Sequence, residues 1–134
     1  MNRATLIAIA ITIGGCGSTG APAVPAGTAP VVSDLKLATT TLTVGKTETL
    51  TGTLKFVDPD KDAKTLKGEI TLSSGQKQAL PGSDAQGVNG AGEGTVILGF
   101  MFNLPTAGSY TLALWMADAA GNESNHLTAT LTAQ

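Results

Sequence analysis

The sequence predicts an all-β domain, a two-sheet Greek-key sandwich of about seven strands. Two observations support this: apolar and small residues recur with a period of two from residue 31 onward, and turn-forming segments separate these rows at short intervals. No helical period of 3.6 residues appears after residue 16. Apolar residues make up 42% of the chain and charged residues 13%, a balance typical of a folded domain rather than a disordered one.

Five rows alternate clearly, over residues 49–56, 66–73, 96–102, 110–116 and 127–132. Two weaker strands are expected over residues 34–44, broken near Thr40, and over residues 76–80. Turn signals such as Asp58-Pro59-Asp60 fall between the rows. The glycine-rich stretch from Gly82 to Gly94 predicts a long mobile loop.

The first fifteen residues are typical of an export signal. A short positive segment precedes a run of ten small and apolar residues, about half the length that a membrane span needs. The run ends in Ile13-Gly14-Gly15-Cys16, which resembles the lipobox of bacterial lipoproteins. That resemblance implies cleavage before Cys16, attachment of palmitate-like acyl chains to its thiol, and anchoring to a membrane. Several acyl chains would give a long-lived anchor.

The chain contains one cysteine, so an intramolecular disulfide is excluded. Lipidation gives Cys16 a role, although an ordinary cleaved signal followed by an incidental free cysteine remains an alternative. The resemblance also bears on sorting, because Gly17 replaces the aspartate that tends to retain lipoproteins in the inner membrane. We therefore expect a bacterial envelope protein, in the outer membrane if the host has one.

Residues 16–30 are expected to form the lipidated cysteine and a flexible linker, since Gly, Pro, Ser, Thr and Ala dominate and no charge occurs. The fourteen residues after Cys16 would reach roughly 40 Å when extended. Residues 31–134 then form the sandwich.

Two segments near the C-terminus make the fold more specific. Residues 104–112, with a Gly-x-Tyr step, and residues 118–124, with Asp-x-x-Gly-Asn, resemble the closing third of bacterial immunoglobulin-like and fibronectin-III-like domains. The resemblance implies that the Tyr110 hydroxyl bonds back to the preceding corner, and that Gly121 and Asn122 adopt the left-handed conformation. The predicted fold is thus a seven-stranded immunoglobulin-like sandwich. It lacks the cysteine pair of antibody domains.

Catalysis and nucleic-acid binding are not expected. His126 is the single histidine, no Gly-x-Ser-x-Gly segment accompanies it, and no second histidine or cysteine is available for zinc. A formal charge of −2 does not suit a phosphate backbone. The chain is therefore predicted to be non-enzymatic.

Acidic residues suggest a calcium site. Asp58, Asp60 and Asp62 alternate in one loop, but Ala63 occupies the glycine position of an EF-hand and strands flank the loop. In a sandwich, this loop meets the loop that holds Asp118 and Asn122 at the same end. The predicted metal ligands are Asp58, Asp60, Asp62, Asp118 and Asn122. The alternative is that these residues only form turns.

Trp115 is the second candidate binding residue. Its parity places it opposite to Tyr110 and Leu112, so it should point out of the core onto a threonine-rich face. An exposed indole could stack on a sugar ring or bind a partner. Alternatively, Lys67 and its neighbours cover the ring, or a bulge reverses the parity.

Taken together, these patterns predict a lipid-anchored envelope protein. Its sandwich would be a non-catalytic binding or structural module that presents loops or a sheet face to an envelope protein or glycan, with calcium as the one candidate cofactor. The alternative is a carbohydrate- or polymer-binding accessory domain that uses Trp115.

Overall fold

The alternating rows form eight strands in the computed structural model, which describes residues 27–134. The predicted signal, Cys16 and most of the linker lie outside the described residues. The strands are β1 (Val31–Leu37), β2 (Thr41–Leu42), β3 (Thr47–Val57), β4 (Ala63–Thr71), β5 (Lys77–Asp84), β6 (Glu93–Asn103), β7 (Gly108–Asp118) and β8 (Leu127–Ala133). Within the described range, no helix is long and apolar enough to cross a bilayer.

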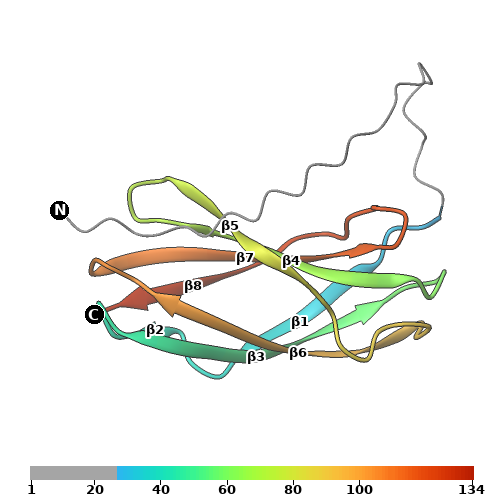
Figure 1. Ribbon diagram of the computed structural model, residues 1–134, viewed down its shortest axis with the longest axis horizontal. Coiled ribbons are helices and arrows are strands. Elements are labelled where there is room, and N and C mark those ends of the chain that lie inside the picture. Colours follow the sequence, from blue (N-terminus) through green and yellow to red (C-terminus); the bar gives the residue numbers. More distant parts are fainter. Residues whose placement is uncertain (1–26) are drawn as a thin grey trace, which may run out of the picture.

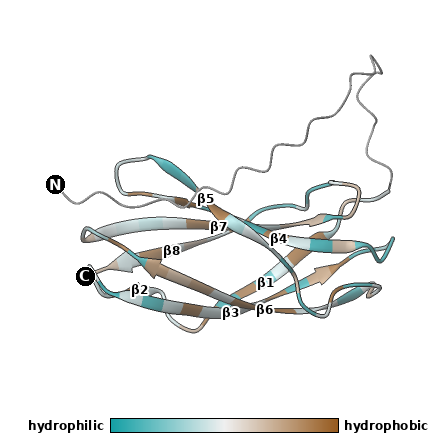
Figure 2. Cartoon of the chain, viewed as in Figure 1, coloured by the Kyte–Doolittle hydropathy of each residue, from teal (hydrophilic) through white to brown (hydrophobic). Residues whose placement is uncertain are grey.

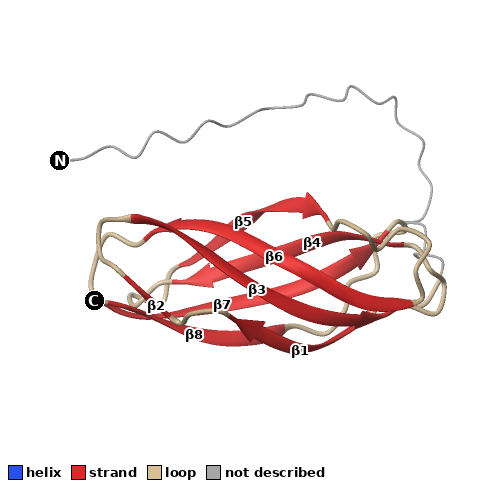
Figure 3. Ribbon diagram, turned by 90° about the horizontal axis from the view of Figure 1, so that it is seen from below, coloured by secondary structure: helices blue, strands red, loops and turns tan. Residues whose placement is uncertain are grey.

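The strands form two layers, which confirms the predicted sandwich (Figures 1 and 3). One sheet has the order β1-β3-β6 and the other the order β2-β8-β7-β4-β5. Neighbouring strands are antiparallel, except that β2 runs parallel to β8. The eighth strand arises because the expected first strand divides into β1 and β2.

The core lies between the layers and is filled by alternate residues of each strand. In β7, Tyr110, Leu112, Leu114 and Met116 are buried, and Leu50 and Leu54 of β3 face them from the other sheet. Figure 2 shows the alternation as brown and paler bands along the strands. Fully burying one such side chain contributes about 1.5–3 kcal/mol, so the period-two rows account for most of the driving force.

The break expected near Thr40 marks a change of sheet. The chain leaves the three-stranded sheet after Leu37 and joins β8 at Thr41. Next to it, the Thr132 N–H donates to the Thr40 carbonyl at 2.7 Å. Residue 40 is therefore where the chain crosses between the layers.

The expected weak strand over residues 76–80 is longer and runs as β5, antiparallel to β4 at the edge of the five-stranded sheet. This extension shortens the predicted mobile loop to residues 85–92. Val88 within that loop is buried in the core, so the loop is anchored by its own apolar residue. The glycine count of the segment gave no sign of this anchor.

The predicted tyrosine corner is present. Tyr110 is buried, its hydroxyl donates to the Thr106 carbonyl at 2.7 Å, and the Thr106 Oγ1 lies 2.9 Å from the same hydroxyl. Gly121 has the expected positive φ of 94°. The same expectation for Asn122 was wrong, because Asp34 and Lys61 are the non-glycine residues with positive φ in the described range. Asn122 is instead held by hydrogen bonds to Asp118.

Candidate functional site

Three loops meet at one end of the sandwich, as the sequence predicts. They are the β3–β4 loop, the β5–β6 loop and the start of the β7–β8 loop, and we call this end the acidic pole. The Ala119 N–H donates to the Asp62 carbonyl at 2.9 Å and the Ala85 N–H to the Lys64 carbonyl at 2.8 Å. These bonds bring the three loops together around a shallow depression lined by Lys61, Asp62, Asp84, Asn89 and others.

Asp58 is buried and supports the β3–β4 loop from inside. Its Oδ2 accepts from the backbone N–H groups of Asp62, at 2.7 Å, and Ala63, while its Oδ1 accepts from Asp60 at 3.3 Å. Both carboxylate oxygens are therefore used in forming the turn. A metal ion at Asp58 would have to compete with these backbone donors.

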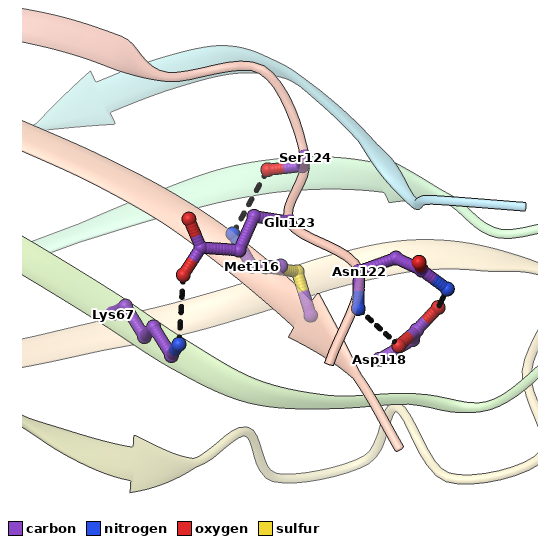
Figure 4. A network of polar contacts seen from close by, with 6 residues as sticks. All are labelled: Lys67, Met116, Asp118, Asn122, Glu123 and Ser124. Carbon is purple, nitrogen blue, oxygen red and sulfur yellow. Dashed lines mark hydrogen bonds and ion pairs between the residues drawn. The ribbon is translucent and has the colours of Figure 1, made fainter. Parts of the chain in front are cut away.

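Asp118 plays the same part in the β7–β8 loop (Figure 4). Its Oδ1 accepts from the Asn122 backbone N–H at 2.7 Å and its Oδ2 from the Asn122 side-chain amide at 2.6 Å. Burial raises the pKa of Asp118, but the hydrogen bonds from Asn122 and from the backbone of Gly121 outweigh it and hold the pKa below its ordinary value. Asp118 is therefore an ionised, buried turn anchor.

Asp62 differs from Asp58 and Asp118, because one of its carboxylate oxygens accepts no hydrogen bond among the described residues. Partial burial raises its pKa, and the negative charges of Asp118, Asp58 and Asp60 raise it further. Its Oδ1 is buried without a hydrogen-bond partner among the described residues. The predicted carboxylates thus do converge, and they repel one another at Asp62. Across residues 27–134, however, no three His, Cys, Asp or Glu side chains form an arrangement that could hold a metal ion.

The chain enters the sandwich at this same pole. The Thr28 N–H donates to the Asp60 carboxylate, and Val31 at the start of β1 pairs with Val57 at the end of β3. A Cβ on Gly27 would lie 2.8 Å from the Asp60 Oδ2, and the φ of Gly27 is 101°, so glycine suits this position. Asp60 is therefore used to receive the incoming chain.

Trp115 lies on the outer face of β7, between the buried residues Leu114 and Met116, as its parity predicts. Its indole stacks on the imidazole of His126, with ring centroids 4.2 Å apart and planes at 12°. One face of the indole is thus covered by a residue that sequence reasoning had considered only as a candidate base.

A polar pair lies beside this stack. Lys67, which pairs with Trp115 in the β4–β7 register, forms an ion pair with Glu123 at 2.8 Å (Figure 4). The Lys67 ammonium holds the pKa of the Glu123 carboxyl below its ordinary value. The indole N–H of Trp115 is buried and has no hydrogen-bond partner among the described residues. The alternative that Lys67 covers the ring is thus replaced by a different arrangement: Lys67 pairs with Glu123, and His126 covers the indole.

Comparison with known proteins identifies the fold. No protein-family model and no curated protein matches the chain. Among solved structures, the chain is similar to the PKD domain of an M14-like peptidase from a Thermoplasmatales archaeon, with a TM-score of 0.50 and 18% identity over 81% of this chain and 98% of that one. The fold is an immunoglobulin-like β-sandwich.

Two larger proteins match more weakly. One is the Pseudomonas fluorescens alkylpurine DNA glycosylase AlkC, with a TM-score of 0.47 and 11% identity over 78% of this chain and 30% of that one. The other is a β-glucosidase from Listeria innocua, with a TM-score of 0.38 and 13% identity over 78% of this chain and 16% of that one. In both, the sandwich corresponds to a minor part of the other protein.

Proposed function

We propose that the chain is a lipid-anchored bacterial envelope protein whose immunoglobulin-like sandwich is a non-catalytic binding or structural module. The observation that carries the proposal is the lipobox-like Ile13-Gly14-Gly15-Cys16, followed by an uncharged linker. The linker would join the sandwich at the acidic pole, where the Thr28 N–H donates to Asp60 and Val31 pairs with Val57.

Membrane partition and acyl labelling test the anchor. The wild-type chain should incorporate labelled palmitate and sediment with membranes. Cys16→Ala should lose the label and keep its signal uncleaved, because the lipobox resemblance implies that processing requires the cysteine. Globomycin should likewise cause the uncleaved precursor of the wild-type chain to accumulate. A wild-type chain that takes up no palmitate, or a Cys16→Ala chain that still takes up the label, would contradict the proposal. Gly17→Asp serves as a matched variant, since it should keep the label and change only the membrane in which the protein is found.

Calcium at the acidic pole belongs to this proposal. It is supported by the buried Oδ1 of Asp62, which has no hydrogen-bond partner among the described residues and lies near the charges of Asp58, Asp60 and Asp118. Because Asp58 and Asp118 already accept turn hydrogen bonds, calcium binding would require their loops to rearrange. Calorimetry should detect heat at millimolar calcium and the melting temperature should rise, with both effects lost in Asp62→Asn. Absence of heat and of a melting shift in the wild-type chain would exclude a useful site.

Glycan binding through Trp115 is the second candidate function. It is supported by the half-buried indole on the outer face of β7, which stacks on the exposed imidazole of His126 beside the Lys67–Glu123 ion pair. Trp115→Ala should abolish retention on a glycan array. His126→Ala should increase retention if the sugar stacks on the indole face that the imidazole covers, and should decrease retention if the sugar stacks on the imidazole. Unchanged retention in Trp115→Ala would remove this candidate.

A further inference from the structure

The two sheets end in four edge strands, and β6 differs from the other three. Edge strands expose unpaired backbone donors and acceptors, and proteins usually protect them with bulges, prolines, charges or shortness. β2 is two residues long. In β1 the register shifts between Ser33 and Lys36, where Asp34 has a φ of 51° and pairs with Lys55. β5 contains Pro81, and its register to β4 shifts at the same place.

β6 has none of these protections. Its eleven residues pair with β3 in one unbroken register from Glu93 to Asn103, and its free side faces no strand of its own sheet. It contains no proline, lysine or arginine, and its single charge, Glu93, lies at one end. A long, regular and uncharged edge of this kind is suited to pairing with another strand.

The outer face of β6 is also apolar. Ile97 is 82% exposed and Met101 is 75% exposed, the two highest values among the large apolar side chains in the described range. Gly99 lies between them, and a Cβ placed there would meet nothing within 4 Å. No other described segment covers this surface. A groove beside the same edge is lined by Phe100 and Met101 of β6 together with Leu80 and Pro81 of β5.

The order of residues along β6 fits a second copy of itself. Ile97 and Met101 each lie two residues from Gly99, so an antiparallel pair of β6 strands centred on Gly99 places Ile97 of each copy opposite Met101 of the other. Thr95 then faces Asn103. The two Glu93 carboxylates fall at opposite ends, roughly 40 Å apart, and so do not repel each other. A two-fold axis through Gly99 thus pairs apolar side chains with apolar ones and places no charged residue opposite another.

We infer that two copies of this chain associate through their β6 edges, in antiparallel register centred on Gly99, to form one continuous six-stranded sheet. This inference goes beyond the proposed function and does not depend on the lipid anchor. Each sandwich contributes β1, β3 and β6, and the apolar pairs of Ile97 with Met101 lie on either side of the two-fold axis.

Disulfide cross-linking of the full chain in cells tests this pairing directly. Directly opposed residues in antiparallel strands have Cα atoms about 4.5–5.5 Å apart, within the range for a disulfide. Gly99→Cys should therefore form a covalent dimer on mild oxidation. Thr51→Cys is the matched control, because Thr51 is exposed on the same face and pairs with Gly99 on the neighbouring strand. Its two copies would be about 14 Å apart, too far for a bond.

We expect at least tenfold more covalent dimer from Gly99→Cys than from Thr51→Cys. The parent chain, with Cys16 alone, should give none beyond the control level. Adding Ile97→Lys to Gly99→Cys should reduce the dimer at least tenfold, because each interface would then carry two like charges and lose both apolar pairs. Equal cross-linking of the two cysteine variants, no dimer from Gly99→Cys, or a cross-link to a different protein would each overturn the inference. Membrane partition of the same samples reports separately on the anchor.

Discussion

The acidic pole and the β6–β7 corner both hold a loop against the core with one buried side chain, but they use different chemistry. At the acidic pole, the Asp58 carboxylate accepts three backbone N–H groups. At the corner, the neutral Tyr110 hydroxyl donates to one carbonyl. A carboxylate accepts more donors than a hydroxyl and makes stronger hydrogen bonds. Its contribution to the free energy of unfolding, however, depends on its ionisation. The two regions should therefore respond differently to mutation and to acid.

The largest effect is expected from Asp58→Ala. The substitution leaves three backbone N–H groups of the β3–β4 loop without their acceptor, and the free energy of unfolding should fall by about 3 kcal/mol. Urea denaturation of wild type and variant measures this difference. Asp60→Ala is the control, because Asp60 is exposed and should contribute much less. Equal losses in the two variants would contradict the anchoring role of Asp58.

Tyr110→Phe should have a smaller effect. It removes the bond to the Thr106 carbonyl while keeping the buried ring, so the free energy of unfolding should fall by about 1 kcal/mol. The loss should be the same at neutral and at acidic pH, because the bond joins a hydroxyl to a backbone carbonyl and involves no carboxylate. Denaturation curves at both pH values check this. A loss of unfolding free energy that changes with acid would contradict the predicted difference between the corner and the acidic pole.

Acid should weaken the acidic pole through Asp118. The pKa of Asp118 is lower in the folded protein than its ordinary value of 3.8, so its stabilising contribution is fully present above that value and is lost as the pH falls through the folded pKa. Melting temperature measured against pH should decline in this range for wild type. Asp118→Asn should be less stable at neutral pH and show a shallower decline. An unchanged slope would show that another carboxylate governs the acid response.

The smallest effect, and the one of opposite sign, is expected at Asp62. Its pKa is raised in the folded protein, so its ionised form opposes folding once the pH exceeds the folded pKa. Asp62→Asn should slightly raise the melting temperature at neutral pH in calcium-free buffer, and the gain should vanish below about pH 4. A decrease at neutral pH would mean that the carboxylate makes a favourable contact instead.

Much of the fold follows from local sequence. Period-two rows predict β3, β4, β6, β7 and β8. The residues of a strand that face the core are apolar whichever strands become its neighbours in the sheet. The Tyr110 corner is expected from the resemblance of residues 104–112 to immunoglobulin-like domains and not from the period-two pattern. The place of β5 could not be predicted, since the choice of neighbouring strand depends on packing across the sandwich. The burial of Val88 could not be predicted either, because it depends on the path of the β5–β6 loop between the two sheets.

The candidate sites were predicted less completely. The meeting of Asp58, Asp62 and Asp118 follows from the order of loops in a sandwich. The direction of their hydrogen bonds does not, because it depends on the backbone of each turn. The stack of Trp115 on His126 could not be expected from parity alone. It requires the β7–β8 loop to fold back, which the bridge between Ala117 and Glu123 brings about.

The parallel pairing of β2 with β8 has a mechanical consequence. The blue start of the described chain, before β1, lies at one end of the long axis and the C-terminus at the other (Figure 1). Tension between a fixed N-terminal linker and the C-terminal end would therefore act along the strands. The bonds from Thr132 to Thr40 and from Gln134 to Leu42 would be loaded in shear, all at once rather than one after another. The two residues of β2 thus give the sandwich a clamp against stretching, although they bury little surface.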